Sequence, residues 1–204
     1  MGSLPELLLN YEKDFQGIIW PKLEIDEDQV NKFRLEIQAK KNFIIGISWK
    51  TKAKQRSYQA NIELHEFMKI FSNYDVSIIN LQHGDVEEEI NQLELKNNID
   101  FINYKKIDNF NDIDGLASLI DMCDLIITID NVTAHLSSAL GKETWVLLPL
   151  NSDYRWGLNS EKSCYYEKAR LFRNKTLNDW ADVLKNVENN LEIKFKQGDS
   201  YEST

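Results

Sequence analysis

Short apolar runs alternate with segments of helical spacing from residue 42 onward. The runs are rich in Ile, Leu and Val and lack polar alternation, which is typical of parallel strands covered by helices on both faces. Their alternation with helices predicts βαβ units in a mainly parallel sheet. The expected strands are residues 43–49, 75–81, 100–104, 124–129 and 144–149, with a sixth at 169–173 on a sheet edge.

The segments between these strands carry apolar residues at helical spacing, so each can lay one apolar stripe on the sheet. They lie at 62–71, 90–95, 113–120 and 180–187. Right-handed crossovers then make a doubly wound, Rossmann-like α/β sheet of about six strands the expected fold. Ligands bind such sheets at the carboxyl ends of the strands. The candidate functional loops are therefore 50–59, 82–86, 130–134 and 149–168.

The two ends of the chain differ from this central pattern. Residues 1–42 contain apolar stretches followed by a charged, weakly helical segment, and we expect a lead-in segment there. Residues 43–195 form the expected Rossmann-like domain. Residues 196–204 have too little apolar content to pack and are expected to form a flexible tail.

The charge balance narrows the possible partners. The 204 residues include 24 basic and 33 acidic side chains, for a formal net charge of -9, which argues against unspecific nucleic-acid binding. No window reaches the roughly 18 apolar residues of a membrane helix, and the start lacks the basic region of an export signal. With two cysteines and no Cys/His spacing of a metal site, we expect no metal, no cofactor and a cytoplasmic setting.

The stretch DNVTAHLSSALGKETWVLLP, residues 130–149, carries the most informative pattern. A buried strand ends at its first residue, Asn131 or Thr133 can cap a short helix, and a glycine ends that helix. The first amides of the helix, near Ala134 and His135, have no intrahelical partner and suit a phosphate. An ordinary capped helix fits the same spacing equally well.

A basic loop follows the first strand. Lys50, Lys52, Lys54 and Arg56 fall within seven residues without an acid between them. This loop adjoins the switch point between the first and fourth strands, where an anionic ligand is expected. Charge-assisted contacts to a diphosphate would follow. A solvated loop with scattered lysines is the alternative interpretation.

An acidic segment and two missing motifs limit the chemistry. Residues 85–114 carry nine acids and three lysines, which we interpret as a solvated face. The acids do not follow the spacing of a calcium-binding loop. The chain also lacks the Gly-Lys-Ser/Thr phosphate loop and the Gly-x-Gly-x-x-Gly pattern, which argues against a nucleotide hydrolase or a nicotinamide enzyme.

Two histidines and one long loop complete the candidate site. His83 follows the second strand in a ligand-side loop, so it is a candidate binding residue. His135, in the first turn of the proposed phosphate helix, can donate to a phosphate. The loop 149–168 adds Arg155 and Trp156, which suit a sugar or a charged group, although a Trp that plugs the sheet end fits as well.

Several segments together resemble the carboxyl-terminal half of GT-B glycosyltransferases. The likeness is strongest to bacterial proteins that join tetratricopeptide repeats to a glycosyltransferase domain, related to the heptosyltransferases and more distantly to protein O-linked N-acetylglucosamine transferases. Its most specific motif is Asp-x-x-x-x-His-Leu-x-x-Ala-Leu-Gly-Lys followed by an apolar strand, and the likeness covers about residues 43–190. The segments are IGISWK at 45–50, INLQHGD at 79–85, DLIITIDNVTAHLSSALGKETWVLLP at 124–149, DYRW at 153–156 and ARLFRN at 169–174.

The resemblance implies a site for a nucleotide-diphosphate sugar. By analogy Lys50 faces the diphosphate, Gln82 and its neighbours face the nucleoside, and Asp130 orders the phosphate loop. The residues implied to bind the phosphates through backbone N–H groups are Thr133, Ala134, His135 and Leu136. After Lys50 the chain reads Thr-Lys-Ala-Lys, where the family usually has a glycine or a shorter polar turn. The general base usually comes from the other half of a GT-B enzyme, so no catalytic residue is assigned.

Three functions fit these observations. The first is the donor-binding domain of a glycosyltransferase, with a saccharide, a lipid-linked glycan or a protein as the acceptor. The second is a nucleotide-sugar or acceptor binding module without turnover, and the third is half of a GT-B-like sugar-nucleotide epimerase. A missing amino-terminal domain would leave an interdomain face uncovered, so self-association into a homo-oligomer is a further expectation.

Overall fold

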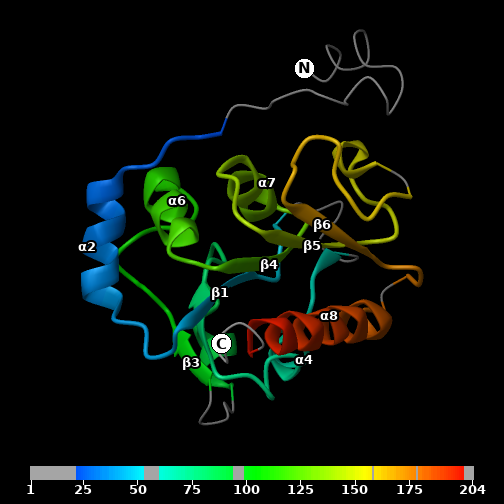
Figure 1. Ribbon diagram of the computed structural model, residues 1–204, viewed down its shortest axis with the longest axis horizontal. Helices are drawn as coiled ribbons and strands as arrows, with labels where there is room; N and C mark the ends of the chain where they lie inside the picture. Colours follow the sequence, from blue (N-terminus) through cyan, green and yellow to red (C-terminus); the bar gives the residue numbers. More distant parts are fainter. Residues whose placement is uncertain (1–21, 53–59, 94–98, 158, 178, 200–204) are drawn as a thin grey trace, which may run out of the picture.

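A single parallel sheet organises the protein. The computed structural model describes residues 22–52, 60–93, 99–157, 159–177 and 179–199. Within these residues six strands form one sheet in the order β3-β2-β1-β4-β5-β6, and every neighbouring pair is parallel (Figure 1). The strands are β1 (Phe43–Ser48), β2 (Val76–Asn80), β3 (Ile99–Ile102), β4 (Leu125–Ile129), β5 (Thr144–Leu148) and β6 (Ala169–Arg173). The predicted doubly wound sheet, with its sixth strand at an edge, is confirmed.

Helices cover both faces of the sheet, as the near-continuous apolar strands predict. All five residues of β2, β4 and β5 are buried. Helices α4 and α8 pack against one face of the sheet, and α2, α6 and α7 lie on the other side (Figure 1). The helices are α2 (Glu27–Ile37), α4 (Leu64–Lys69), α5 (Glu87–Asn91), α6 (Ile113–Asp121), α7 (Val132–Ala139) and α8 (Ala181–Asp199).

Helix α2 places the end of the expected lead-in segment inside the packed body. Asp26 caps the helix by accepting from the amides of the second and third residues after it. Val30 and Phe33 are buried in one core with Leu116 and Leu119 of α6. Part of the 1–42 segment therefore belongs to the domain, because α2 covers α6. Residues 1–21 lie outside the described residues.

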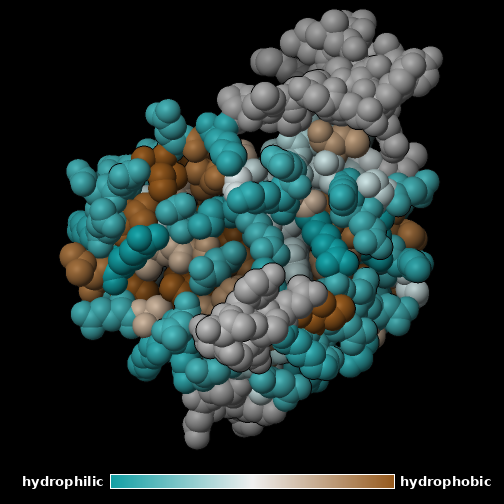
Figure 2. Space-filling model, in the orientation of Figure 1, coloured by the Kyte–Doolittle hydropathy of each residue, from teal (hydrophilic) through white to brown (hydrophobic). Residues whose placement is uncertain are grey.

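Helix α8 runs further than the sequence suggests. It ends at Asp199, so the first residues of the expected 196–204 tail are helical. The crossover helix α5 is short and ends at Asn91, and Leu95 of its expected apolar stripe lies outside the described residues. Figure 2 shows a largely hydrophilic face in which hydrophobic residues gather over α2 and α6.

The switch point lies between β1 and β4. From β1 the chain moves outward through β2 to β3, returns through α6 to β4, and then moves the opposite way to β6. The loops after β1, β2, β4 and β5 therefore meet at the carboxyl edge of the sheet.

Candidate functional site

A buried network of neutral side chains joins the ends of β1, β2 and β4. Gln82 Oε1 accepts hydrogen bonds from Ser48 Oγ (3.0 Å) and from the backbone amides of the next two residues (2.8 and 2.7 Å). Gln82 Nε2 donates to the carbonyl of Lys50 (3.1 Å). From the other side, Asn131 Nδ2 donates to Ser48 Oγ (2.7 Å) and to the Lys50 carbonyl (3.4 Å). We call Ser48, Gln82 and Asn131 the amide clamp, because together they fix the loop after β1.

Asn131 is also the N-cap of α7. Its Oδ1 accepts from the amides of Thr133 (3.0 Å) and Ala134 (3.4 Å). The sequence-based expectation that the first amides of this helix are open to a phosphate is therefore wrong for these two, because the cap oxygen already occupies them. The open part of the helix end is its first residue, Val132, whose side chain is 47% exposed. Among the described residues, no group accepts a hydrogen bond from the Val132 amide.

Lys50 has a fixed backbone and a side chain turned towards α5. Its ammonium lies 2.8 Å from Glu89 Oε2, and the two side chains are 34% and 22% exposed. The acidic segment that contains Glu89 was expected to be a solvated face, and that interpretation is wrong for this residue. Lys50 is thus at the predicted edge, but its charge is already paired with a carboxylate.

Gln82 borders a hollow of about 320 Å³ at the ends of β2 and β3. Its amide group is buried and already bonded to the protein on both sides, so it acts first as a scaffold. Asn109, on the same wall, donates through Nδ2 to the carbonyls of Gln82 (3.2 Å) and Asn80 (3.4 Å). The other lining residues are Gly84, Asp85, Val86, Glu87, Asn103, Tyr104, Lys105, Ile107 and Asp108.

His83 is buried beside the clamp in surroundings that favour the neutral imidazole. Its Nδ1 lies 3.4 Å from Gln82 Nε2, so Nδ1 accepts and the ring proton is on Nε2. Burial, and next the charge of Lys52, lower the pKa of His83. Its ring packs at 5.8 Å from that of Phe110. A packing role accounts for these contacts.

A second network, of charged and aromatic side chains, lies at the ends of β4 and β5. Asp130 Oδ1 accepts from Trp156 Nε1 at 2.7 Å, and Oδ2 accepts from the Asp153 amide at 3.4 Å. His135 stacks on Trp156 with ring centroids 4.7 Å apart and bonds through Nδ1 to the Tyr166 hydroxyl at 3.1 Å. We call Asp130, His135, Trp156 and Tyr166 the aromatic cluster. Asp130 therefore orders the loop after β5.

The environment of His135 favours the neutral imidazole. Burial, and next the positive charge of Arg155, lower its pKa, while the carboxylates of Asp130 and Asp153 oppose this shift. The ring Nε2 is 3.9 Å from Asp130 Oδ1, beyond hydrogen-bond distance. His135 is therefore a packed member of the cluster, and its surroundings favour the uncharged ring.

Trp156 and Arg155 differ from the expected sugar platform. Trp156 is 1% exposed, so the alternative interpretation, a Trp that plugs the sheet end, is the one confirmed. Arg155 donates through Nε to Asp153 Oδ1 at 2.8 Å and lies over the ring of Tyr154. Tyr154, at 63% exposed, presents the open aromatic surface here instead.

Of the remaining predicted binding residues, three are packed in the structure and one lies outside the described residues. Thr133 and Ala134 are fully buried on the sheet side of α7. Leu136 packs against the core under α6. Arg56 and the rest of the basic loop from 53 to 59 lie outside the described residues.

Ser48 is one of the site residues that the sequence reasoning missed. It is the single hydroxyl that links Gln82 to Asn131, and it is fully buried. The signal available in the sequence was a polar residue near the end of an otherwise apolar strand. Such a residue must find partners at the strand end, because an unpaired buried hydroxyl is costly.

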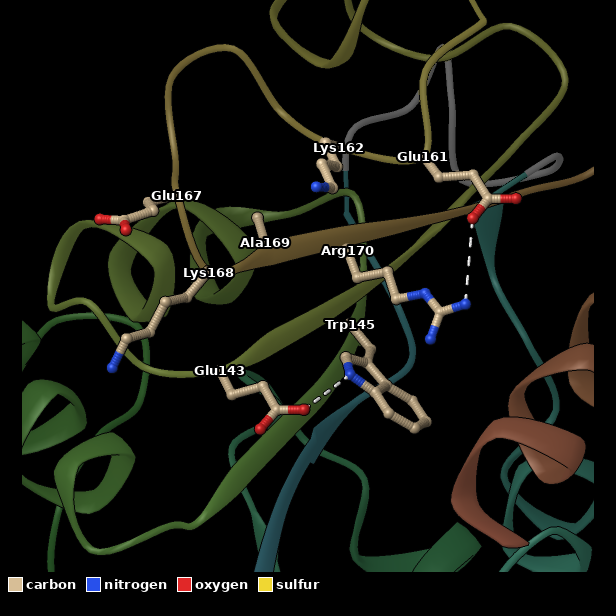
Figure 3. Close-up of a pocket in the computed structure, with 8 residues that line it drawn as sticks. All are labelled: Glu143, Trp145, Glu161, Lys162, Glu167, Lys168, Ala169 and Arg170. Atoms are coloured by element: carbon tan, nitrogen blue, oxygen red, sulfur yellow. Dashed lines mark hydrogen bonds and ion pairs between the residues drawn. The ribbon is translucent and has the colours of Figure 1, made fainter. Parts of the chain in front are cut away.

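A hollow of about 440 Å³ lies at the opposite, amino edge of β5 and β6 (Figure 3). In Figure 3 Glu161 points toward Arg170 and Glu143 toward the indole of Trp145. The charges that line this hollow largely offset one another, since acidic and basic side chains alternate around its rim. The lining residues are Glu143, Trp145, Glu161, Lys162, Glu167, Lys168, Ala169 and Arg170. We therefore place the candidate site at the carboxyl edge and not here.

No described helix has the length and apolar character needed to cross a membrane. Histidine, cysteine and carboxylate side chains in the same residues do not gather in threes at a distance suited to a metal ion.

Comparison with known proteins places the fold. No protein-family model matches the sequence. Protein FlbA of Caulobacter vibrioides is 27% identical over 144 residues, which is 70% of this chain but 24% of that protein. The chain therefore spans about a quarter of this curated relative.

Solved glycosyltransferases share the architecture. The E. coli ADP-heptose lipopolysaccharide heptosyltransferase II superimposes with a TM-score of 0.63 at 16% identity, over 90% of this chain and 56% of that one. A family 9 glycosyl transferase from Veillonella parvula gives 0.51 at 14%, over 81% and 46%. E. coli heptosyltransferase WaaC, solved with ADP, gives 0.51 at 12%, over 87% and 52%. The chain thus has the fold of one Rossmann-like half of a GT-B glycosyltransferase, as expected, and spans about half of these structures.

Proposed function

We propose that this chain is the donor-binding domain of a glycosyltransferase and takes a nucleotide-diphosphate sugar at the carboxyl edge of its sheet. The observation that carries the proposal is the contact between the loop after β1 and the cap of α7. Asn131 bonds to the Lys50 carbonyl and caps the helix with the same side chain. A loop cation and a helix amino end therefore lie on one buried support, and both favour an anion.

The hollow and the helix end suggest how a donor would lie. We place the nucleoside in the hollow beside Gln82, where side-chain amides and carboxylates can meet its polar groups. The diphosphate would extend toward the exposed first turn of α7 at Val132. There the side chain of Lys50 and the positive end of the helix would stabilise the departing nucleoside diphosphate electrostatically. The bond broken joins the sugar to the diphosphate, and the bond formed joins the sugar to an acceptor oxygen.

The similar structures support this choice of ligand. One was solved with ADP and another is named for ADP-heptose, so a nucleoside diphosphate is the natural first probe. Since the chain spans about half of these structures, we expect the acceptor and the general base to meet the donor from a second domain. A longer parent protein with an upstream Rossmann-like domain or repeats would fit this arrangement.

The carboxyl edge carries large apolar side chains that such a domain could cover. Val132 is 47% exposed, Leu150 50% and Tyr154 63%, and all three follow β4 or β5. Self-association is the other way to cover this face. Size-exclusion chromatography with light scattering tests it, and a monomer at every micromolar concentration would contradict a homo-oligomer. The cytoplasmic setting stays a prediction, and both cysteines are free thiols.

Calorimetric titration tests the proposed function. The chain is titrated with ADP, UDP and GDP and with a sugar conjugate of each. We expect saturable binding of one nucleotide, and a Lys50→Ala substitution should weaken it by about five- to tenfold, because a charge-assisted contact to phosphate is lost.

Lys168→Ala is the matched control. It removes the same charge from the hollow at the amino edge, far from the proposed donor, and should leave the dissociation constant within about twofold. The proposal is wrong if none of the nucleotides binds, or if the two lysine substitutions have the same effect.

A further inference from the structure

The partner of the Lys50 ammonium is held in place by the fold. Glu89 Oε2 contacts Lys50 Nζ at 2.8 Å, while Glu89 Oε1 accepts from the Leu64 amide at 3.2 Å. Leu64 opens α4, and the N-cap of that helix, Glu63, makes no side-chain capping bond. Glu89 therefore supplies a missing cap to α4 with one oxygen and binds Lys50 with the other.

The surroundings of this ion pair are acidic. A hollow of about 410 Å³ opens beside it and contains one lysine and four acids, with lining residues Lys50, Glu63, Asp85, Val86, Glu88, Glu89 and Gln92. An anionic ligand that approached Lys50 from this side would meet uncompensated negative charge. A diphosphate can reach the ammonium only if the Lys50 side chain turns away from Glu89.

Only the side chain of Lys50 is free to make that turn. The amide of Lys50 donates to Gln82 Oε1 at 2.7 Å, and its carbonyl accepts from Gln82 and Asn131. The flexible four-carbon stem carries the charge beyond this fixed backbone. The competition between Glu89 and a bound phosphate is therefore local and involves one ammonium group.

We propose that Glu89 competes with the donor for Lys50 and thereby discriminates against the free nucleoside diphosphate in favour of its sugar conjugate. This inference rests on the proposed function. Near neutral pH a nucleoside diphosphate carries about one more negative charge than its sugar conjugate, because a terminal phosphate has a second pKa of about 6. The Lys50 ammonium attracts the more highly charged species more strongly, so its pairing with Glu89 costs that species more binding. Glu89 is thus a specificity-determining residue that weakens binding of the product.

Glu89→Gln tests the inference with little change in shape. Gln keeps an oxygen for the Leu64 amide, so the thermal unfolding midpoint should stay near that of the unmodified protein. Glu88→Gln is the matched control, because it removes the same charge from the same hollow and Glu88 does not pair with Lys50. The probes are ADP, ADP-glucose and adenosine, with the uridine or guanosine set in their place if that nucleotide binds the unmodified chain.

The expected result separates the three probes. Glu89→Gln should lower the dissociation constant of ADP by about three- to tenfold and that of ADP-glucose by about twofold or less. This is the scale expected of a partly exposed ion pair. Adenosine should bind as before, and Glu88→Gln should change each dissociation constant by less than about twofold. The gain for ADP should vanish in a Lys50→Ala background.

Other outcomes overturn the inference in recognisable ways. If the unmodified chain binds the nucleotides and Glu89→Gln weakens ADP, or tightens ADP, ADP-glucose and adenosine alike, Glu89 does not act through Lys50 and the charge of the ligand. If it behaves as Glu88→Gln does, the pairing has no effect on binding. If neither protein binds any nucleotide of the three sets, the proposed function itself fails and the inference fails with it.

Discussion

The amide clamp and the aromatic cluster hold neighbouring loops at one edge of the sheet with different chemistry. The clamp uses Gln82 and Asn131, whose side-chain amides donate and accept at the same time. Each can therefore bridge two segments without any charge. The cluster depends on the carboxylate of Asp130, which only accepts. It must draw its donors, the indole of Trp156 and the amide of Asp153, from the loop after β5.

The two networks meet within one peptide unit. Asp130 and Asn131 are consecutive, yet the first contacts the loop after β5 and the second contacts the loop after β1. The neutral network lies where an anionic ligand is expected, and the charged one is buried against aromatic rings. The clamp therefore positions the loop near the proposed diphosphate without adding negative charge of its own. The acids beside Lys50, Glu89 among them, come from outside the clamp.

Gln82→Met is expected to have the largest effect. Met has a similar length and packs well, but it removes every hydrogen bond that Gln82 makes to the amides and the carbonyl after β1. Each buried polar group left without a partner costs about 1–3 kcal/mol, so we expect the free energy of unfolding to fall by about 4 kcal/mol. Urea unfolding measures this loss.

Gln92→Met, at an exposed position after α5, is the control for Gln82→Met and should change the free energy of unfolding by less than about 0.5 kcal/mol. A loss below about 1 kcal/mol for Gln82→Met would show that the clamp is not needed to hold these loops.

Asp130→Asn should have an intermediate effect and tests the charged network. Trp156 Nε1 and the Asp153 amide bond to different oxygens of Asp130. In Asn one of these oxygens becomes an NH2 group, which donates and cannot accept from the donor it faces. One of these buried donors loses its partner, and we expect a loss of about 2 kcal/mol in the free energy of unfolding. Asp28→Asn, on the exposed first turn of α2, is the charge-matched control. Equal losses in the two variants would show that the cluster contributes nothing beyond its charge.

The fold could be read from the sequence because its rules are local. Strands buried on both faces must be apolar throughout, so β2, β4 and β5 are visible as continuous apolar runs. Right-handed crossovers then favour a doubly wound sheet. The limits of α5 and α8 were less clear, since a five-residue helix and a charged carboxyl-terminal helix give weak periodicity.

The site could be read only in part because its contacts are long-range. The sequence places Gln82, Asn131 and Asp130 at strand ends, and the structure brings them to one edge. It does not reveal that Ser48 links the first two, because Ser48 is 34 residues from Gln82 and 83 from Asn131. Glu89 was missed for the same reason, since one glutamate among nine acids has no local mark of its ion pair.

The pH dependence of stability should show the smallest effect and sharpen the comparison further. The pKa of His135 is lowered in the folded protein by burial and by Arg155, from an ordinary value of 6.5. The unfolded chain therefore binds a proton at a higher pH than the folded one. The stabilising contribution of His135 is complete above about pH 6.5 and is lost as the pH falls, with a slope of at most about 1.4 kcal/mol per pH unit.

His83 contributes to the pH dependence of stability with the same sign, because burial and the charge of Lys52 lower its pKa as well. We expect urea unfolding between pH 7.5 and 5.5 to show a declining free energy, and the decline to become shallower in His135→Gln and in His83→Gln. His65→Gln, which removes an exposed imidazole outside both networks, is the control for the substitution itself. If His83→Gln flattens the profile and His135→Gln does not, the acid sensitivity belongs to the clamp side, and the aromatic cluster tolerates a charged imidazole beside Asp130.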